Sequence, residues 1–225
     1  MTPDLPFGTV IAVLGAECTG KTSLARAVAA HLAQRGLAIR LVPEYLREWC
    51  DREQRTPAAH EQAAIAAEQT RRIAGAAARG IAVADTTALM TAVYSDMLFG
   101  DASLYAEAVA AQRSYAITLL TALDLPWVPD GLQRDGPHVR EPVDARVRDT
   151  LQRAAVPYAV VHGSGPQRLA SAWNAMFRTS EAADRDGDPA GNPQTSASDW
   201  HWSCDKCSDP ACEHRLFSDL VAGRR

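Results

Sequence analysis

Short apolar runs rich in β-branched residues alternate along this chain with longer, alanine-rich stretches that carry interspersed polar residues. The short runs have the length of buried strands, and the longer stretches have the length of helices. The predicted strands are residues 9–14, 37–42, 80–84, 117–123 and 158–161. The predicted helices are residues 24–34, 57–78, 88–97, 102–113, 144–154 and 167–177, with a helical turn at 44–49.

The regular alternation of strands and helices predicts right-handed βαβ units that build one parallel sheet. Thr56 and Pro57 are expected to start the longest helix, as an N-cap followed by a proline at the first helical position. We therefore expect an α/β fold with three layers, in which helices cover both faces of the sheet. In such folds, ligands bind beyond the carboxyl ends of the strands.

The segment 15–23 reads GAECTGKTS and fits the phosphate-loop (P-loop) pattern G-x-x-x-x-G-K-[ST]. It lies between the first predicted strand and the first predicted helix, which is the context that this motif requires. Backbone N–H groups at such a turn bind anions, Lys21 reaches the β- and γ-phosphates, and the Thr22 hydroxyl ligates Mg²⁺. The sequence thus predicts the fold of P-loop nucleoside triphosphate hydrolases and kinases. The predicted nucleotide-binding residues are Gly15, Glu17, Cys18, Thr19, Gly20, Lys21, Thr22, Ser23 and Arg140.

Two carboxylates follow predicted strands and are expected beside the phosphate loop. Asp85 is expected to hold Mg²⁺ together with Thr22, and the alternative is an aspartate that caps the next helix. Thr86 stands where many motor ATPases carry a glutamate that polarises water, which favours transfer to an acceptor over hydrolysis. Glu44 is expected to accept a hydroxyl proton or to bind sugar hydroxyls, and the alternative is a carboxylate stabilised by the helix dipole. Which carboxylate acts as the base stays open.

The polar loop 124–142 has the composition of a lid over the nucleotide. Arg134 and Arg140 are expected to close on phosphate and to stabilise charge during transfer. Trp127 is expected to stack on a flat ring, and its π face would attract a cationic one. The alternative is an ordinary surface loop with a buried tryptophan. The predicted substrate-binding residues are Glu44, Tyr45, Arg47, Trp127 and Asp130; the predicted catalytic residues are Lys21, Glu44, Asp85 and Arg134.

Composition narrows the class of protein. With 225 residues, 47% of them hydrophobic, the chain suits one α/β domain with a sizeable core and a small addition. A net charge of −4 gives no general attraction to nucleic acid or to anionic membranes. The sequence contains no run of about 18 apolar residues, and its first residues lack the features of a signal peptide. We therefore expect a cytoplasmic protein that neither enters a membrane nor binds nucleic acid.

The amino-acid composition changes after residue 177, which is the predicted end of the P-loop kinase domain 1–177. Residues 178–199 are acidic and rich in glycine, proline, serine and threonine, and they predict a flexible linker. Residues 200–225 are rich in cysteine and predict a small metal-binding module that docks onto the kinase domain or a protein partner.

In this module, three thiolates and one imidazole match the ligands of a closed tetrahedral Zn²⁺ site. The predicted ligands are Cys204, Cys207, Cys212 and His214. His201 competes for the fourth position. An iron–sulfur cluster and an unmetallated, redox-sensitive tail are the alternatives. A segment this short cannot build a hydrophobic core unaided, so structural zinc would supply its folding free energy.

Four segments together resemble the ribosylnicotinamide kinase domain of NadR-type proteins, a P-loop kinase group with relatives among AAA-type ATPases. The likeness covers about residues 10–177 and rests on segments 15–23, 44–48, 85–87 and 126–134. It implies ATP-dependent phosphorylation of the ribose 5′-hydroxyl of nicotinamide riboside, which gives nicotinamide mononucleotide. The adenylyltransferase domain and the helix-turn-helix of NadR-type proteins are missing from this sequence. The resemblance therefore predicts neither NAD synthesis beyond the kinase step nor DNA repression.

Three hypotheses about function follow. The first is a Mg²⁺- and ATP-dependent kinase for nicotinamide riboside. The second is a kinase for another nucleoside or metabolite. The third is a nucleotide-gated regulatory protein whose ATP state is transmitted to a partner through the cysteine-rich tail.

Overall fold

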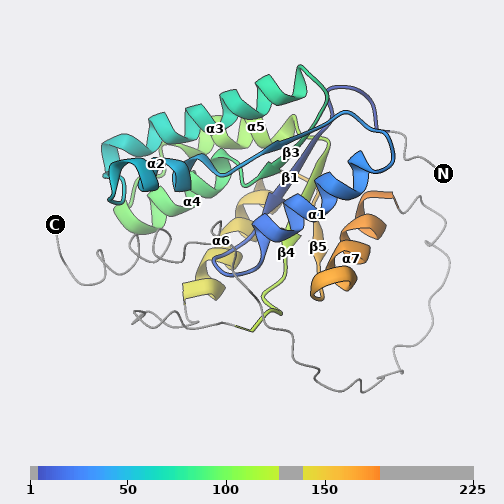
Figure 1. Cartoon of the computed structure of the whole chain (residues 1–225). Helices are drawn as coiled ribbons and strands as arrows, with labels where there is room; N and C mark the ends of the chain where they lie inside the picture. Colours follow the sequence, from blue (N-terminus) through green and yellow to red (C-terminus); the bar gives the residue numbers. More distant parts are fainter. Residues whose placement is uncertain (1–4, 127–138, 178–225) are drawn as a thin grey trace.

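The computed structural model describes residues 5–126 and 139–177, and it confirms a three-layer α/β fold (Figure 1). Five parallel strands form one sheet in the order β2-β3-β1-β4-β5. The strands are β1 (Val10–Leu14), β2 (Ile39–Val42), β3 (Ile81–Asp85), β4 (Ile117–Thr121) and β5 (Ala159–Val161). The helices are α1 (Lys21–Ala33), α2 (Tyr45–Glu53), α3 (Gln62–Ala77), α4 (Ala88–Phe99), α5 (Tyr105–Arg113), α6 (Arg140–Arg153) and α7 (Gly165–Phe177), and a short 3₁₀ helix, η1 (Ala59–Glu61), precedes α3.

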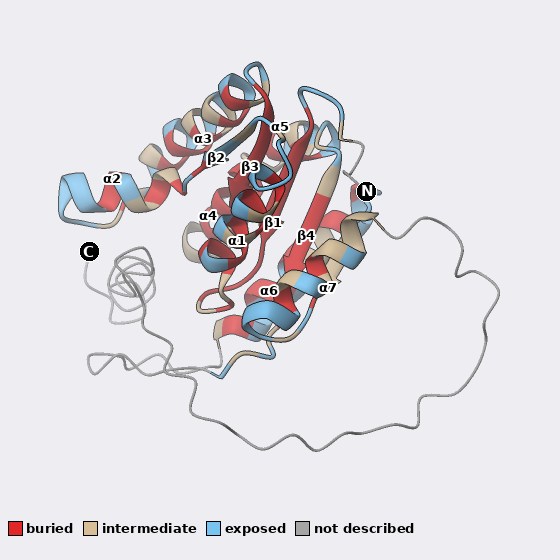
Figure 2. Ribbon diagram, turned by 45° about the vertical axis from the view of Figure 1, so that its right-hand side comes forward, coloured by how far each residue is buried: buried red, intermediate tan, exposed pale blue. Residues whose placement is uncertain are grey.

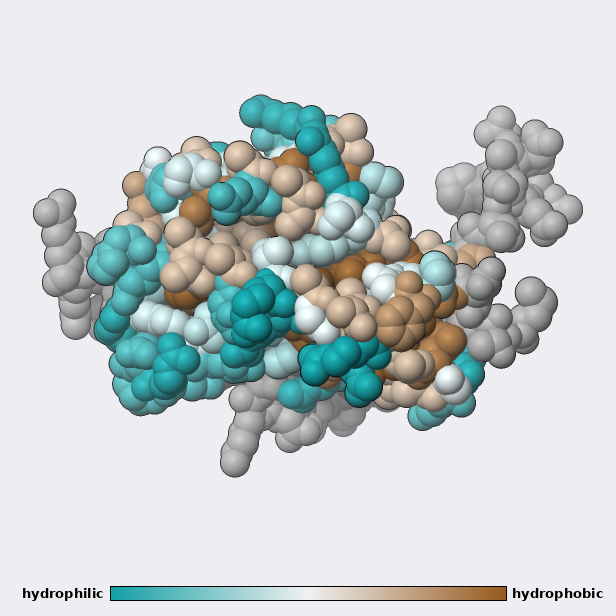
Figure 3. All heavy atoms as spheres, turned by 90° about the horizontal axis from the view of Figure 1, so that it is seen from above, coloured by the Kyte–Doolittle hydropathy of each residue, from teal (hydrophilic) through white to brown (hydrophobic). Residues whose placement is uncertain are grey.

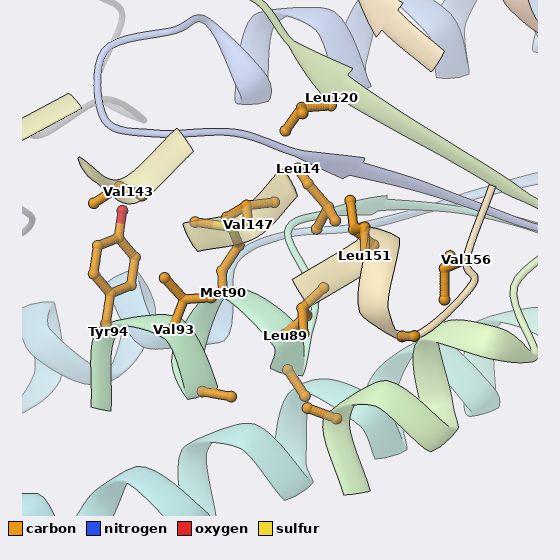
Figure 4. Close-up of a cluster of buried hydrophobic side chains, with 14 of the residues drawn as sticks. Leu14, Leu89, Met90, Val93, Tyr94, Leu120, Val143, Val147, Leu151 and Val156 are labelled. Carbon is orange, nitrogen blue, oxygen red and sulfur yellow. The ribbon is translucent and has the colours of Figure 1, made fainter. Parts of the chain in front are cut away.

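The strands form the middle layer, and the inner strands β1, β3 and β4 are almost entirely buried, as Figure 2 shows by colour. The edge strands β2 and β5 are partly exposed. β1 is buried over its whole length, because it is the central strand and has helices on both faces. Ile11 and Val13 pack on the side of α1 and α7. Leu14 packs on the opposite side, in a cluster with α4 and α6 (Figure 4). Successive residues of β1 therefore point to opposite faces of the sheet, and both faces are covered by helices. For this reason a strand of a parallel sheet is encoded by a continuous apolar run and not by alternating apolar and polar residues.

Strand order places the predicted site at one edge of the sheet. β1 lies between β3 and β4, and β2 lies beyond β3. Because all the strands run in the same direction, their carboxyl ends share one edge of the sheet. The phosphate loop leaves β1 at this edge, Glu44 follows β2, and Asp85 is the last residue of β3. The fold therefore gathers residues that are 70 positions apart in the sequence, as the strand-end rule predicts.

The predicted start of the longest helix is wrong. Thr56 and Pro57 lie before the helical segment, and Ala58 is the N-cap of η1. The carboxylate of Glu61 accepts a hydrogen bond from the Ala58 N–H at 2.8 Å, and the Arg55 guanidinium donates two more to it. A capping carboxylate located three residues after the N-cap thus sets the start of the helical segment, and the proline only precedes it.

Two other helices begin three or more residues earlier than predicted. α1 begins at Lys21 rather than Leu24, so the lysine and the threonine of the phosphate loop belong to its first turn. α6 begins at Arg140, inside the predicted loop 124–142. In both cases the first turn consists mostly of polar residues, and the helical spacing of apolar residues begins only one turn later. The pattern therefore predicts a helix start that is too late.

Two predicted units lie outside the described residues: the linker 178–199 and the cysteine-rich module 200–225. Within the described ranges, none of the helices is long and apolar enough to cross a bilayer. The face seen from above mixes hydrophilic with hydrophobic residues (Figure 3). Phe7 and Leu41 are the large hydrophobic residues exposed in the described part of the chain.

Candidate active site

The phosphate loop joins β1 to α1 in a conformation that requires glycine at its first position. Gly15 has φ of 152°, and a Cβ added there would lie 1.9 Å from the Thr121 hydroxyl oxygen. The last loop glycine, Gly20, has φ of 76° and is the N-cap of α1. Cys18 also lies in the left-handed region, with φ of 52°. This backbone directs the loop around the N-terminus of α1, which is where anions bind.

Hydrogen bonds within the loop hold its shape. Thr19 Oγ1 donates to the Ala16 carbonyl at 2.7 Å and lies 2.6 Å from the hydroxyl oxygen of Thr121. The Thr121 hydroxyl in turn donates to the Leu14 carbonyl at 3.1 Å. Lys21 is buried, and its Nζ donates to the Ala16 carbonyl at 2.8 Å. This hydrogen bond holds the lysine ammonium within the loop. Glu17 is also buried in this loop, whereas Ser23 is exposed on α1.

A cavity of about 120 Å³ opens beside the first turn of α1. Its lining combines residues from α1, the end of β2, α2 and the end of β3. The lining residues are Thr22, Arg26, Leu41, Pro43, Glu44, Arg47, Glu48, Asp51 and Asp85. The structure thus brings four predicted site residues, Thr22, Glu44, Arg47 and Asp85, around one space. Four carboxylates and two guanidinium groups line it, so the formal charge of the lining is negative.

Asp85 is buried, with 3% exposure, at the last position of β3. The proposed alternative of a helix-capping aspartate is wrong, because Thr87 is the N-cap of α4 and accepts the Leu89 N–H at 3.2 Å. Thr86 lies between them with φ of 65°, which is unusual for a β-branched residue. Backbone strain of this kind is typical of functional sites. Asp85 therefore faces the cavity at the carboxyl end of β3 and does not start the helix.

Glu44 is the N-cap residue of α2, but its side chain makes no capping hydrogen bond to that helix. Instead, Arg47 Nη2 donates to Glu44 Oε2 at 2.9 Å, in an ion pair that is mostly buried. Arg47 thus holds the glutamate at the cavity wall, and Glu44 is one of the residues that line the cavity. Tyr45 lies next to it, yet it is not a lining residue; the Arg72 guanidinium lies 4.3 Å from the centre of its ring.

Two buried arginines lie on the other side of the phosphate loop. Arg140 is 5% exposed, and its Nη1 donates to the Leu125 carbonyl at 3.1 Å. Arg168, on α7, donates to the Thr19 carbonyl at 3.0 Å and to Asp124 Oδ1 at 2.8 Å. Burial lowers the pKa of Arg168, and the ion pair with Asp124 opposes this shift. Arg168 thus ties the phosphate loop to the end of β4.

Arg168 is not among the site residues predicted from the sequence. Its partners Thr19 and Asp124 are 149 and 44 residues away in the sequence, so no local pattern links them. A single arginine in an amphipathic helix is usually a surface residue. Three other predicted site residues, Trp127, Asp130 and Arg134, lie outside the described ranges.

A second, larger groove of about 360 Å³ lies between α5 and α6. Its lining includes Tyr105, Val109 and three arginines, and it contains none of the residues predicted from the sequence. We therefore place the candidate active site at the phosphate loop and the smaller cavity.

Comparison with known proteins identifies the family of the chain. A family model described as an AAA domain, AAA_28, matches residues 10–168, which is more than half of the chain. The chain belongs to this AAA domain family. The match begins at β1 and ends at Arg168, so it includes the phosphate loop and the whole cavity lining. No curated protein matches the sequence.

Solved structures share the fold of this AAA domain at low sequence identity. A NadR protein in complex with NAD and AMP-PNP is 19% identical with a TM-score of 0.56. A NadR protein in complex with NR is 20% identical with a TM-score of 0.57. Each match covers 76% of this chain and 49% of the NadR chain, so the protein spans about half the length of these relatives. Deoxyadenosine kinase from M. mycoides with bound dCTP is 12% identical with a TM-score of 0.50, over 75% of this chain and 98% of that one.

The AAA domain offers suitable ligands for Mg²⁺. A threonine hydroxyl and a carboxylate, from Thr22 and Asp85, line the same cavity. Mg²⁺ prefers such hard oxygen donors and usually keeps several waters, so one or two protein ligands suffice. Within residues 5–126 and 139–177, no group of three or more His, Cys, Asp or Glu side chains is placed so that it could hold a metal ion.

Proposed function

We propose that the protein is an ATP-dependent kinase that phosphorylates a hydroxyl of a nucleoside-like acceptor, with nicotinamide riboside as the first candidate. The observation that carries the proposal is the cavity in which Glu44 and Asp85 lie beside Thr22 of the phosphate loop. A kinase needs an acceptor pocket directly next to the terminal phosphate of ATP. The fold similarity to NadR proteins and to deoxyadenosine kinase supports the same activity.

Each residue of the site has a proposed role. The amides of the loop and Lys21 bind the β- and γ-phosphates, and Arg140 and Arg134 stabilise the charge of the transferring group. Thr22 and Asp85 would hold Mg²⁺, which would supply positive charge to offset that of the phosphates. Glu44 or Asp85 accepts the proton of the acceptor hydroxyl, and Arg47 holds Glu44 in place.

The negative lining of the cavity favours a cationic acceptor. Glu44, Glu48, Asp51 and Asp85 face two arginines there. Nicotinamide riboside carries a positively charged pyridinium ring, so its attraction to the carboxylates exceeds that of a neutral nucleoside. Trp127 and Asp130 remain proposed contacts for this ring, and Tyr45 remains a proposed substrate contact. A nucleoside with a neutral base is the second candidate, because the match with deoxyadenosine kinase covers nearly all of that chain.

A coupled assay of ADP formation over a panel of nucleosides tests the proposal. The wild type is expected to form ADP in a saturable, acceptor-dependent way, fastest with nicotinamide riboside. If Glu44 is the base, Glu44→Gln lowers kcat by about 100-fold or more and leaves the KM for ATP unchanged. Glu53→Gln, at an exposed position of the same helix, is the matched control. ATP binding without turnover of any acceptor would instead favour a nucleotide-gated regulatory protein.

The proposal extends to the remainder of the chain. Residues 1–177 form the kinase domain, residues 178–199 a linker, and residues 200–225 a zinc module that contacts the kinase domain or a partner. We also propose that the protein acts in the cytoplasm.

A further inference from the structure

Gln69 lies in the middle of α3 with only 2% exposure. A buried amide is stable only when its polar atoms have hydrogen-bond partners. Its Oε1 accepts the Tyr45 N–H at 2.7 Å. Its Nε2 lies 3.4 Å from each of two carbonyl oxygens, those of Pro43 and Thr86. One side chain therefore contacts two separate segments of the backbone.

These two segments carry the carboxylates of the candidate site. Pro43 and Tyr45 flank Glu44 on both sides, and Thr86 directly follows Asp85. The amide of Gln69 thus reaches the backbone beside each carboxylate.

The contact lies where the sheet no longer holds the two segments together. The last register pair between β2 and β3 is Val42 with Ala84. Beyond this pair, hydrogen bonds between β2 and β3 no longer fix the distance between the segment of Glu44 and the end of β3. The Gln69 side chain contacts both backbones just beyond this last pair, and so it connects the two segments where the sheet hydrogen bonds end.

The conformation of Thr86 adds to the need for this bridge. Its φ of 65° is unfavourable for a threonine, so the surrounding structure must hold it. The Thr86 N–H donates to the Val13 carbonyl at 3.0 Å, and its carbonyl faces Gln69. Without the amide, the Thr86 carbonyl would lose this side-chain contact.

We propose that Gln69 is a positioning residue, which fixes Glu44 and Asp85 relative to each other across the acceptor cavity. The inference rests on the proposed kinase function. The amide touches neither substrate nor phosphate; it acts through the backbone next to the two carboxylates. Small displacements of such groups reduce turnover strongly, whereas ATP bound at the phosphate loop is not affected.

The test compares Gln69→Leu with the wild type in the acceptor-dependent ADP assay. Leucine keeps the buried volume and removes the hydrogen bonds. We expect kcat/KM for the acceptor to fall by about 10-fold to 100-fold, with the Kd for ATP within about twofold of the wild type. Thr70→Val is the matched control on the same helix. The Thr70 hydroxyl donates to the Ala66 carbonyl one turn earlier and also hydrogen-bonds to the Tyr115 side chain. Neither partner lines the cavity, so this variant should retain wild-type kinetics.

A second variant separates positioning from simple loss of packing. In Gln69→Glu, the protonated carboxyl can accept the Tyr45 N–H and donate to a carbonyl, as glutamine does. A buried carboxyl beside two carbonyl oxygens has a raised pKa. The activity of Gln69→Glu, relative to the wild type, should therefore increase as the pH falls, whereas that of Gln69→Leu should not. Thermal unfolding of both variants over the same pH range distinguishes a change in the turnover of folded protein, which positioning predicts, from a change in the amount of folded protein, which a packing role predicts.

The outcomes are distinguishable. If the wild type turns over an acceptor and Gln69→Leu matches it, or if Gln69→Leu weakens ATP binding as much as acceptor turnover, the positioning role is refuted and the kinase function stands. If the wild type turns over no acceptor, the proposed function fails, and the role of Gln69 fails with it.

Discussion

At the scale of single residues, the candidate site depends on buried polar groups whose partners are distant in the sequence. Arg168 joins the phosphate loop to the end of β4, and Gln69 joins the ends of β2 and β3. The sequence indicated residues that the structure brings around one cavity, Thr22, Glu44 and Asp85 among them, because the phosphate-loop motif and the strand-end rule are local patterns. It did not indicate the residues that hold them, because no local pattern distinguishes a buried glutamine or arginine in a helix from an exposed one.

Replacing Arg168 by leucine should destabilise the protein and weaken nucleotide binding. The change leaves the carbonyls of Thr19 and Ala122 and the carboxylate of Asp124 without their guanidinium partner. Loss of one member of a buried ion pair costs about 3 kcal/mol of unfolding free energy. Denaturant unfolding and titration with ATP measure the two effects. Arg153→Leu, which removes an exposed ion pair with Asp149, is the control and should change stability by less than about 0.5 kcal/mol. Equal stability of the two variants would contradict this role of Arg168.

At the scale of elements, the sequence predicted every strand and nearly every helix to within a few residues. Apolar runs and helix stop signals are strong in a parallel α/β fold, because both faces of the sheet are buried. The errors concern helix starts. At the helical segment that leads into α3, the Glu61 side chain determines the boundary, through bonds to Ala58 and Arg55 that depend on the folded turn.

The start of α3 should therefore be sensitive to acid. Hydrogen bonds from Arg55, and less strongly from the Ala58 N–H, lower the pKa of Glu61 to about 2. A carboxyl with a lowered pKa stabilises the folded state above its unfolded pKa, near 4.5, and this contribution is lost as the pH falls toward 2. In thermal unfolding, the wild type should lose more stability between about pH 6 and about pH 3 than Glu61→Gln does. Glu107→Gln, at an exposed position of α5, should behave as the wild type; an identical pH dependence for Glu61→Gln would contradict the prediction.

At the scale of the whole molecule, the three-layer fold is accounted for, and the chain beyond residue 177 remains a prediction. The family match ends at residue 168, so it does not include the cysteine-rich segment. Its spacing favours structural zinc over an iron–sulfur cluster. The sequence could predict the sheet order no further than its parallel class, because strand order depends on tertiary packing and not on local periodicity.

Metal analysis of the purified full chain tests the zinc prediction. The wild type should contain about one Zn²⁺ per chain, as expected for a closed four-ligand site. Cys207→Ser removes one predicted ligand and should lower the zinc content severalfold. Cys50 is a buried residue of α2 and not a predicted ligand, so Cys50→Ser should leave the zinc content unchanged. If the zinc content is the same in the wild type and in Cys207→Ser, the predicted zinc site is contradicted.

The central claim is that ATP held by the phosphate loop donates its terminal phosphoryl group to an acceptor in the adjoining cavity. The most direct measurement follows label from γ-labelled ATP into nicotinamide riboside, or into another nucleoside, with wild type and Lys21→Ala side by side. The account predicts a labelled nucleotide product with the wild type and a loss of at least about 100-fold with Lys21→Ala. Absence of labelled product with the wild type, or equal transfer by Lys21→Ala, would contradict it.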